Sequence, residues 1–163
     1  MSTAVLSIGS NSGDRVARLQ GAVDAHRPWL VAISPVYETA PWGPVPQDDF
    51  LNAVLIVRDP QATPVTWLSR AQVAEAAAQR SREIHWGPRT LDVDVIAVDD
   101  VTSRDPVLTL PHPRAAERAF VLLPWLAVQP DAQLGASSVA QLLARLAPDD
   151  LAGVRVRADL ELS

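Results

Sequence analysis

In the N-terminal half, short runs of consecutive apolar residues alternate with segments whose apolar residues are spaced as on one face of a helix. The runs at 4–9, 29–36 and 50–57 are rich in branched side chains and end at turn formers, which predicts three strands. Between the first two runs, Asp14 can cap a helix with one apolar face, and Pro28 ends it. This part of the chain therefore predicts a strand, a helix and two further strands.

Residues 37–49 break the pattern, because prolines, glycine and Trp42 are mixed there with acids. We expect a stiff, irregular loop of the kind that often binds ligands. A helix is predicted from Thr63 to Gln79, a charged linker from 80 to 85, and a strand over 91–98.

Further helices are predicted over 117–128 and 137–146, and the tail after Gly153 is ambiguous. The order β-α-β-β-α-β predicts an α+β fold with a ferredoxin-like core, namely a mainly antiparallel sheet with helices packed on it.

The composition narrows the function classes. The 163 residues suit a single domain spanning 1–163, and 48% apolar residues can form a core. There is no cysteine, so thiolate metal sites and cysteine nucleophiles are excluded. The net charge of −5 argues against nucleic acid or an anionic membrane as a partner.

All 14 basic residues are arginines, so the lysine of a P-loop kinase is absent. The first residues have no basic region followed by a long apolar stretch, and no run is long enough to span a membrane. We therefore expect a cytoplasmic protein that is a monomer or a small oligomer, with a monomer as the first expectation.

Asp92 and Asp94 lie two residues apart in the apolar run 91–98. Side chains at this spacing in a strand point to the same side, with Cα atoms roughly 7 Å apart. Such carboxylates can hold one Mg²⁺ between them or two ions side by side, with water and phosphate as further ligands. A D-x-D pair is also common on solvated strands. Within an apolar strand, however, carboxylates are costly unless they are paired or bind a cation.

The basic residues near this pair have two interpretations each. Arg89 can be a structural counter-ion, or its planar fork can reach a nucleotide phosphate. Arg80 and Arg82 can mark a solvated helix end or a basic loop over polyphosphate, and the charge pattern alone favours the former. His112, held between two prolines, suits a turn as well as it suits a ligand role.

A longer string decides between these interpretations. Residues 86–95 read W-G-P-R-T-L-D-V-D-V, which resembles the signature W-G-P-R-T-x-D-x-D-[ILV] of the 6-hydroxymethyl-7,8-dihydropterin pyrophosphokinases. The resemblance extends over about residues 6–130. Supporting matches are Ile8–Asn11, Tyr37–Thr39, Gly43–Pro44, Phe50–Ala53, Pro111–Arg114 and Glu117–Leu122.

The resemblance implies transfer of the β,γ-pyrophosphoryl group of ATP to the hydroxymethyl oxygen of a reduced pterin, releasing AMP, in folate synthesis. It implies two Mg²⁺ ions held by Asp92 and Asp94. The catalytic residues implied are Arg80, Arg82, Arg89 and Asp94. Those implied at ATP are Gln72, Glu75, Arg89, Val95, Thr109, His112 and Arg118. Those implied at the pterin are Thr39, Ala40, Trp42, Phe50, Asn52, Trp86 and Phe120.

Departures from the family pattern support one alternative. His85 stands where arginine is usual, and Gln79 stands where glycine is usual. These changes would suit a pterin- or nucleotide-binding module with weakened catalysis. A purely structural ferredoxin-like protein is a second alternative, but it leaves the paired aspartates unexplained.

Overall fold

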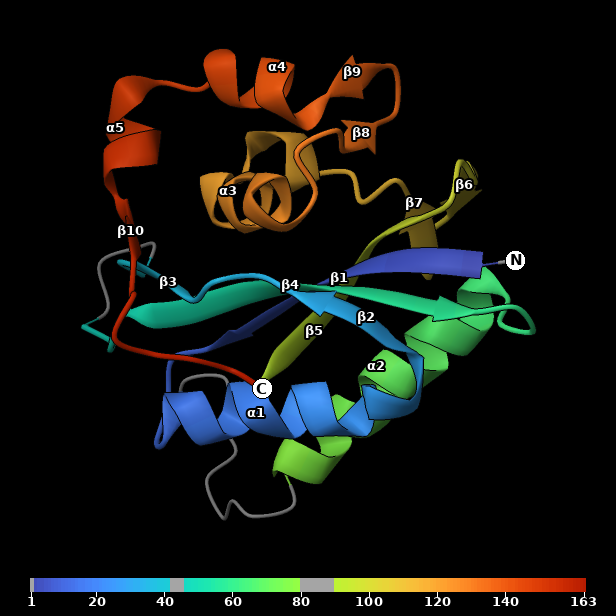
Figure 1. Ribbon diagram of the computed structural model, residues 1–163, viewed down its shortest axis with the longest axis horizontal. Helices are drawn as coiled ribbons and strands as arrows, with labels where there is room; N and C mark the ends of the chain where they lie inside the picture. The colour runs from blue at the N-terminus through green and yellow to red at the C-terminus, as the bar shows by residue number, and fades with distance from the viewer. Residues whose placement is uncertain (1, 42–45, 80–89) are drawn as a thin grey trace.

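The computed structural model describes residues 2–41, 46–79 and 90–163. Its main element is one twisted sheet in which neighbouring strands run antiparallel (Figure 1). The path through the sheet is β10–β3–β4–β1–β5, and β2 pairs with the other end of β4. The strands are β1 (Ser2–Ser10), β2 (Leu30–Ile33), β3 (Tyr37–Thr39), β4 (Phe50–Asp59), β5 (Asp92–Val98) and β10 (Val154–Val156).

Two helices cover one face of this sheet, α1 (Arg15–Ala25) and α2 (Pro64–Gln79) (Figure 1). Helix α1 begins where the Asp14 carboxylate accepts a hydrogen bond from the Ala17 N–H at 3.1 Å, which caps the first turn. Helix α2 buries Trp67, Ala71 and Ala74, residues three and four apart on one stripe, against the sheet. The Trp67 indole N–H donates to Ser2 Oγ at 2.8 Å, so its polar edge is satisfied inside the core.

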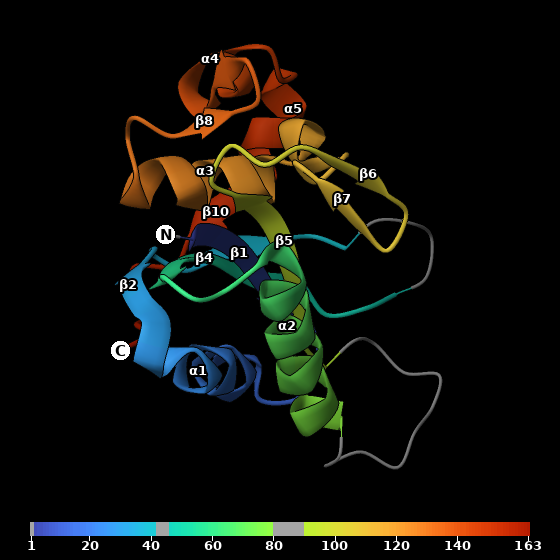
Figure 2. The same cartoon turned by 90° about the vertical axis from the view of Figure 1, so that its right-hand side faces the viewer.

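The other face carries α3 (Ala119–Val128), α4 (Val139–Ala144) and α5 (Pro148–Ala152), with the 3₁₀ turn η2 (Ala115–Glu117) before them (Figures 1 and 2). Leu122 and Trp125 of α3 belong to the same buried cluster as Val54, Ile56 and Ile96 of the sheet. The sheet therefore has an apolar core on each side, and α3 covers only part of the second face.

Smaller elements complete the chain. They are η1 (Arg27–Trp29), the hairpin of β6 (Ser103–Asp105) with β7 (Leu108–Leu110), and the hairpin of β8 (Gln133–Leu134) with β9 (Ser137–Ser138). No helix among the described residues is long and apolar enough to cross a membrane.

The predicted β-α-β-β-α-β order is confirmed by β1, α1, β2, β4, α2 and β5, with β1 in the middle between β4 and β5. Four local predictions are wrong. Residues 37–39 form strand β3 instead of loop, and the run 29–36 forms a strand only over 30–33. The helices predicted to begin at Glu117 and Ser137 begin at Ala119 and Val139. The ambiguous tail forms β10, which pairs with β3. Short strands such as β3 and β10 form because partner strands supply their hydrogen bonds, and local sequence carries little signal for that pairing.

Candidate active site

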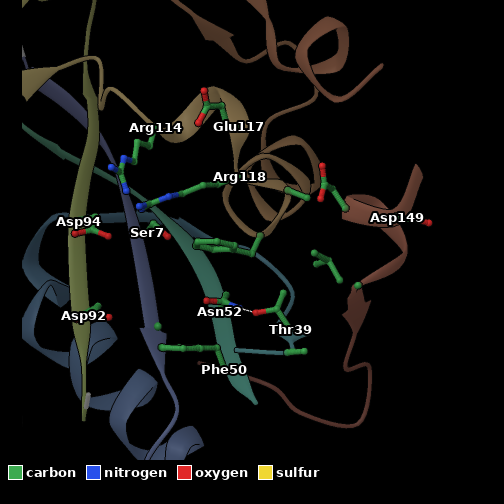
Figure 3. Close-up of a pocket in the computed structure, with 17 residues that line it drawn as sticks. Ser7, Thr39, Phe50, Asn52, Asp92, Asp94, Arg114, Glu117, Arg118 and Asp149 are labelled. Atoms are coloured by element: carbon green, nitrogen blue, oxygen red, sulfur yellow. Dashed lines mark hydrogen bonds between the residues drawn. The ribbon is translucent and has the colours of Figure 1, made fainter. Parts of the chain in front are cut away.

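A cavity of about 760 Å³ lies between the α3 side of the sheet and the helices beyond it (Figure 3). Its walls come from β1, β3, β4, β5, the segment around α3, and the C-terminal segment. The lining residues are Ser7, Gly9, Thr39, Ala40, Phe50, Asn52, Asp92, Asp94, Arg114, Glu117, Arg118, Ala119, Phe120, Asp149, Asp150, Gly153 and Val154.

Strand register explains why distant residues meet on the floor of this cavity. Gly9 of β1 pairs with Asn52 of β4 on one side and with Asp92 of β5 on the other. Ser7, two residues earlier, pairs with Asp94. Directly opposed residues in neighbouring strands share a face of the sheet. One row of the sheet thus brings an amide and a carboxylate to the same opening.

Asn52 is held in one orientation. It is 3% exposed, and its Nδ2 donates to the Thr39 hydroxyl at 3.0 Å. Its Oδ1 lies 3.1 Å from where a Cβ on Gly9 would be, so only glycine lets the amide sit this close to β1. A fixed side-chain amide offers both a carbonyl acceptor and an N–H donor to a flat heterocycle.

Asp92 and Asp94 both face the cavity, which agrees with the predicted same-side placement on β5 (Figure 3). Asp92 begins the strand, and both side chains are half-buried at the cavity wall. They therefore do not interrupt a fully buried strand, and the open cavity lowers the cost of their charge. Among the described residues, the Asp94 carboxylate accepts no hydrogen bond and forms no ion pair.

The aspartate pair fits Mg²⁺ better than a metal enclosed by protein ligands. Within 2–41, 46–79 and 90–163, no three acidic or histidine side chains gather closely enough to enclose an ion. Mg²⁺ is commonly bound through one or two carboxylates, with water and substrate phosphates as the other ligands. Two carboxylates on an open wall provide this arrangement.

Cationic side chains approach the same wall from the α3 side. Arg114 and Arg118 extend toward Ser7 and Asp94 (Figure 3). The Arg118 guanidinium carbon lies 5.7 Å from the centre of the Phe120 ring, which keeps its charge over an aromatic face. This end of the cavity therefore places positive charge opposite the carboxylates.

His112 lies beside this charged end. Its backbone N–H donates to the Ile96 carbonyl at 2.8 Å, which ties it to β5, and its Nδ1 accepts from the Arg114 N–H at 3.2 Å. Burial lowers the pKa of His112; the charge of Asp94 raises it, and those of Arg118 and Arg114 lower it. The net direction is downward, so the imidazole is neutral near pH 7 and Nε2 carries the hydrogen.

Five described residues expected at ATP, with His112 among them, lie outside the cavity lining. Gln72 is exposed on α2, whereas Glu75 Oε1 accepts from the Val93 N–H at 3.1 Å. The Thr109 hydroxyl donates to the Asp105 carbonyl at 2.9 Å. Val95 is buried in the core on the α1–α2 side.

The structure brings Thr39, Ala40, Phe50, Asn52, Asp92, Asp94, Arg118 and Phe120 together around one cavity. Five other expected site residues lie outside the described residues: Trp42, Arg80, Arg82, Trp86 and Arg89.

Sequence reasoning missed part of the lining. Ser7 and Gly9 could have been found from strand alternation, and Arg114 lies within a motif that was recognised. The C-terminal lining residues gave no signal, because a short edge strand and two exposed acids resemble any polar tail.

Comparisons with known proteins agree with this geometry. The profile of the 7,8-dihydro-6-hydroxymethylpterin-pyrophosphokinase family matches residues 5–130. The chain belongs to this pyrophosphokinase family. Its activity is the transfer of the pyrophosphoryl group of ATP to 6-hydroxymethyl-7,8-dihydropterin in folate biosynthesis.

Several curated pyrophosphokinases are similar over nearly their whole length. The 2-amino-4-hydroxy-6-hydroxymethyldihydropteridine pyrophosphokinase of Mycobacterium tuberculosis is 52% identical, covering 96% of this chain and 90% of that protein. The enzyme of the same name from Methylorubrum extorquens is 43% identical, covering 93% and 98%.

A solved structure supports the pyrophosphokinase fold. Plasmodium falciparum HPPK-DHPS matches with a TM-score of 0.70 and 15% identity, covering 88% of this chain. The chain spans only 44% of the length of that protein.

Proposed function

We propose that the cavity between β1, β4, β5 and α3 is the active site, with the pterin at its Asn52 end and the ATP polyphosphate at its arginine end. The observation that carries this proposal is the division of the cavity. One end presents a fixed amide and aromatic side chains, while the other presents two carboxylates and two guanidinium groups. A neutral heterocycle and a polyanion would each find their chemical complement there.

At the pterin end, Asn52 and Thr39 would bind the polar edge of the ring, with Ala40 beside them. Phe50 and Phe120 would supply apolar contact to its flat faces. Trp42 and Trp86 are proposed to belong to the same pocket on the basis of the signature alone. Thr39 and Gly9 already hold the Asn52 amide in place. Pterin binding would therefore lose little free energy in ordering this side chain.

At the polyphosphate end, Arg118 and Arg114 would neutralise phosphate charge, with Arg80, Arg82 and Arg89 proposed for the same task from the signature. His112, as a neutral Nε2–H donor, would hydrogen-bond a phosphate oxygen without adding charge. The remaining nucleotide contacts are proposed at Gln72, Glu75, Thr109 and the backbone of Val95.

Asp92 and Asp94 would hold Mg²⁺, and we propose two ions. When bound, the metal neutralises phosphate charge and orients the reacting oxygens. The residues of the chain would align the hydroxymethyl oxygen with the β-phosphorus. That oxygen loses its proton to solvent as it bonds to the β-phosphorus, the bond from the β-phosphorus to the α,β-bridging oxygen breaks, and AMP leaves with the bridging oxygen. Such transfer needs positioning and charge stabilisation more than a covalent protein group.

The whole chain, 1–163, is proposed to act as one catalytic domain, in the cytoplasm and as a monomer. ATP and the reduced pterin are its small-molecule partners.

The decisive experiment is AMP release. Protein incubated with ATP, Mg²⁺ and 6-hydroxymethyl-7,8-dihydropterin should form AMP, and omission of the pterin or addition of excess EDTA should stop it. The alternative of a weakened binding module predicts pterin or nucleotide affinity by calorimetry without AMP. Folded protein that binds both substrates and releases no AMP would overturn the catalytic assignment.

A further inference from the structure

A buried charge lies directly behind the pterin end of the cavity. Glu38 of β3 is 9% exposed, and three arginines surround its carboxylate. Arg15, at the start of α1, lies 2.9 Å from Oε2, while Arg155 of β10 lies 2.9 Å from Oε1 and Arg157 lies 3.2 Å from Oε2. The Glu38 carboxylate therefore forms ion pairs with arginines from both the N-terminal and the C-terminal part of the chain.

Two of these arginines also contact the start of β4. Arg15 donates to the Asp49 carbonyl at 2.8 Å, and Arg155 lies 3.2 Å from the Asp49 carboxylate. The cluster of Glu38, Asp49, Arg15, Arg155 and Arg157, here called the edge cluster, thus joins the end of β3 to the beginning of β4. Bonds to charged partners are among the stronger hydrogen bonds in proteins.

The residues next to the edge cluster in sequence are the ones that line the cavity. Thr39 and Ala40 follow Glu38, and Phe50 follows Asp49. Because successive side chains in a strand point to opposite faces, Glu38 faces α1 while Thr39 faces the cavity. The backbone held by Glu38 on one face therefore positions the Thr39 hydroxyl, which accepts the hydrogen bond from Asn52.

The C-terminal strand β10 contributes to both the edge cluster and the cavity wall. In β10, Arg155 pairs directly with Glu38, and Val154 pairs with Thr39 and lines the cavity. Both lie beyond residues 5–130, the part of the chain that matches the family profile. The tail of this chain therefore helps build a wall of the site.

We propose that the edge cluster is a positioning device for the pterin end of the active site, and that Arg155 couples the C-terminal strand to substrate affinity. The inference rests on the proposed placement of the pterin at Thr39 and Asn52. Glu38 touches no substrate in this arrangement, and it acts by fixing the backbone of β3. Its loss should weaken pterin binding and leave ATP binding nearly unchanged.

The test compares Glu38→Gln, which keeps the shape of the side chain and removes its charge, with the unaltered protein. We expect the KM for the pterin to rise about tenfold, with the KM for ATP changed less than about twofold. Arg155→Gln keeps Arg15 and Arg157 on Glu38 and should raise the pterin KM about threefold. The assay is run well below the melting temperature of each variant.

Asp24→Asn is the matched control, because it removes an exposed ion pair with Arg27 at the far end of α1. It should leave both KM values unchanged. If Glu38→Gln does not fold, Arg155→Gln carries the test. A pterin KM within twofold of the unaltered protein in every folded cluster variant, or equal changes in both KM values, overturns the inference.

A further variant separates this inference from the proposed site. Asn52→Ala should raise the pterin KM whether or not the edge cluster matters. If Asn52→Ala raises it and the cluster variants do not, the positioning role is wrong and the site stands. If Asn52→Ala has no effect on the pterin KM, the proposed site is wrong.

Discussion

The two ends of the sheet face beneath α3 are built from the same three strands and have opposite properties. At the packed end, Val54, Ile56 and Ile96 are buried with Leu122 and Trp125. At the open end, Gly9, Asn52 and Asp92 occupy the row where side chains meet a cavity instead of a helix. The same strands therefore form core at one end and cavity wall at the other. The difference arises because α3 packs against one end of the sheet and leaves the other end open, where polar side chains can contact a ligand.

The largest effect is expected at the open end. Asp94→Asn should lower kcat/KM by about 10³-fold, because it removes a charge proposed to hold the metal and to act most strongly in the transition state. The melting temperature should change little, since the carboxylate is half-buried and makes no hydrogen bond or ion pair within the described part of the chain. AMP release and thermal unfolding measure the two effects. Full activity in the variant would remove the metal role from Asp94.

The packed end should respond in the opposite manner. Leu122→Ala should reduce the free energy of unfolding by about 3 kcal/mol, because a fully buried side chain leaves a cavity. Activity per folded molecule should remain at low temperature. Val107→Ala is the control, since Val107 is 72% exposed and its loss should cost less than about 0.5 kcal/mol. Urea unfolding with a parallel assay distinguishes the two ends.

A smaller effect on pterin KM is expected when Gly9 of β1 is replaced by alanine, with the same replacement at Gly21 of α1 as the comparison. Gly9→Ala places a Cβ 3.1 Å from Asn52 Oδ1 and should raise the pterin KM roughly fivefold by displacing the amide. Gly21→Ala meets nothing within 4 Å and should keep the KM while stabilising α1 by about 0.5–1 kcal/mol. Steady-state kinetics at saturating ATP measures the difference. Equal pterin KM values in the two variants would contradict the close fit at Gly9.

The smallest effect is a pH dependence on the opposite face. Burial lowers the pKa of His26, the hydrogen bond to the Ala22 carbonyl raises it, and the charge of Arg70 lowers it, with a net downward direction. Below the ordinary histidine pKa of about 6.5, the unfolded chain therefore binds more protons than the folded one. Stability from this group is present above that pH and is lost as the pH falls.

His26→Gln should make the fall in stability between about pH 7 and pH 5.5 shallower, as measured by urea unfolding. Carboxylates of lowered pKa, such as Glu38, act in both proteins and cancel in the difference. Equal slopes for the two proteins would show that His26 is not the group responsible.

Much of the fold could be predicted because its signals are local. The apolar runs of β1, β4 and β5, the Asp14 cap of α1 and the proline that opens α2 each reflect preferences within a few residues. Strands β3 and β10 could not be predicted in this way. Each is only three residues long, and its hydrogen bonds come from neighbouring strands: β3 pairs with β4 and β10, and β10 pairs with β3.

The residues of the candidate site also differ in whether local sequence could predict them. Asp92 and Asp94 were found from their spacing, and Asn52, Thr39 and Phe120 from a resemblance. Nothing local predicted that Glu38 would be surrounded by Arg15, Arg155 and Arg157, because these arginines lie up to 119 positions from Glu38 in the sequence. Long-range charge pairing depends on which strand edges meet.

By itself, the sequence determined the family, the order of the main strands and helices, and the aspartate pair. Each of these can be recognised from adjacent or regularly spaced residues. Only the tertiary structure decided which residues share a row, which end of the sheet stays open, and that the C-terminal strand completes the wall of the site. Those outcomes depend on strand register and on how far the covering helix reaches, which are properties of contacts between distant segments.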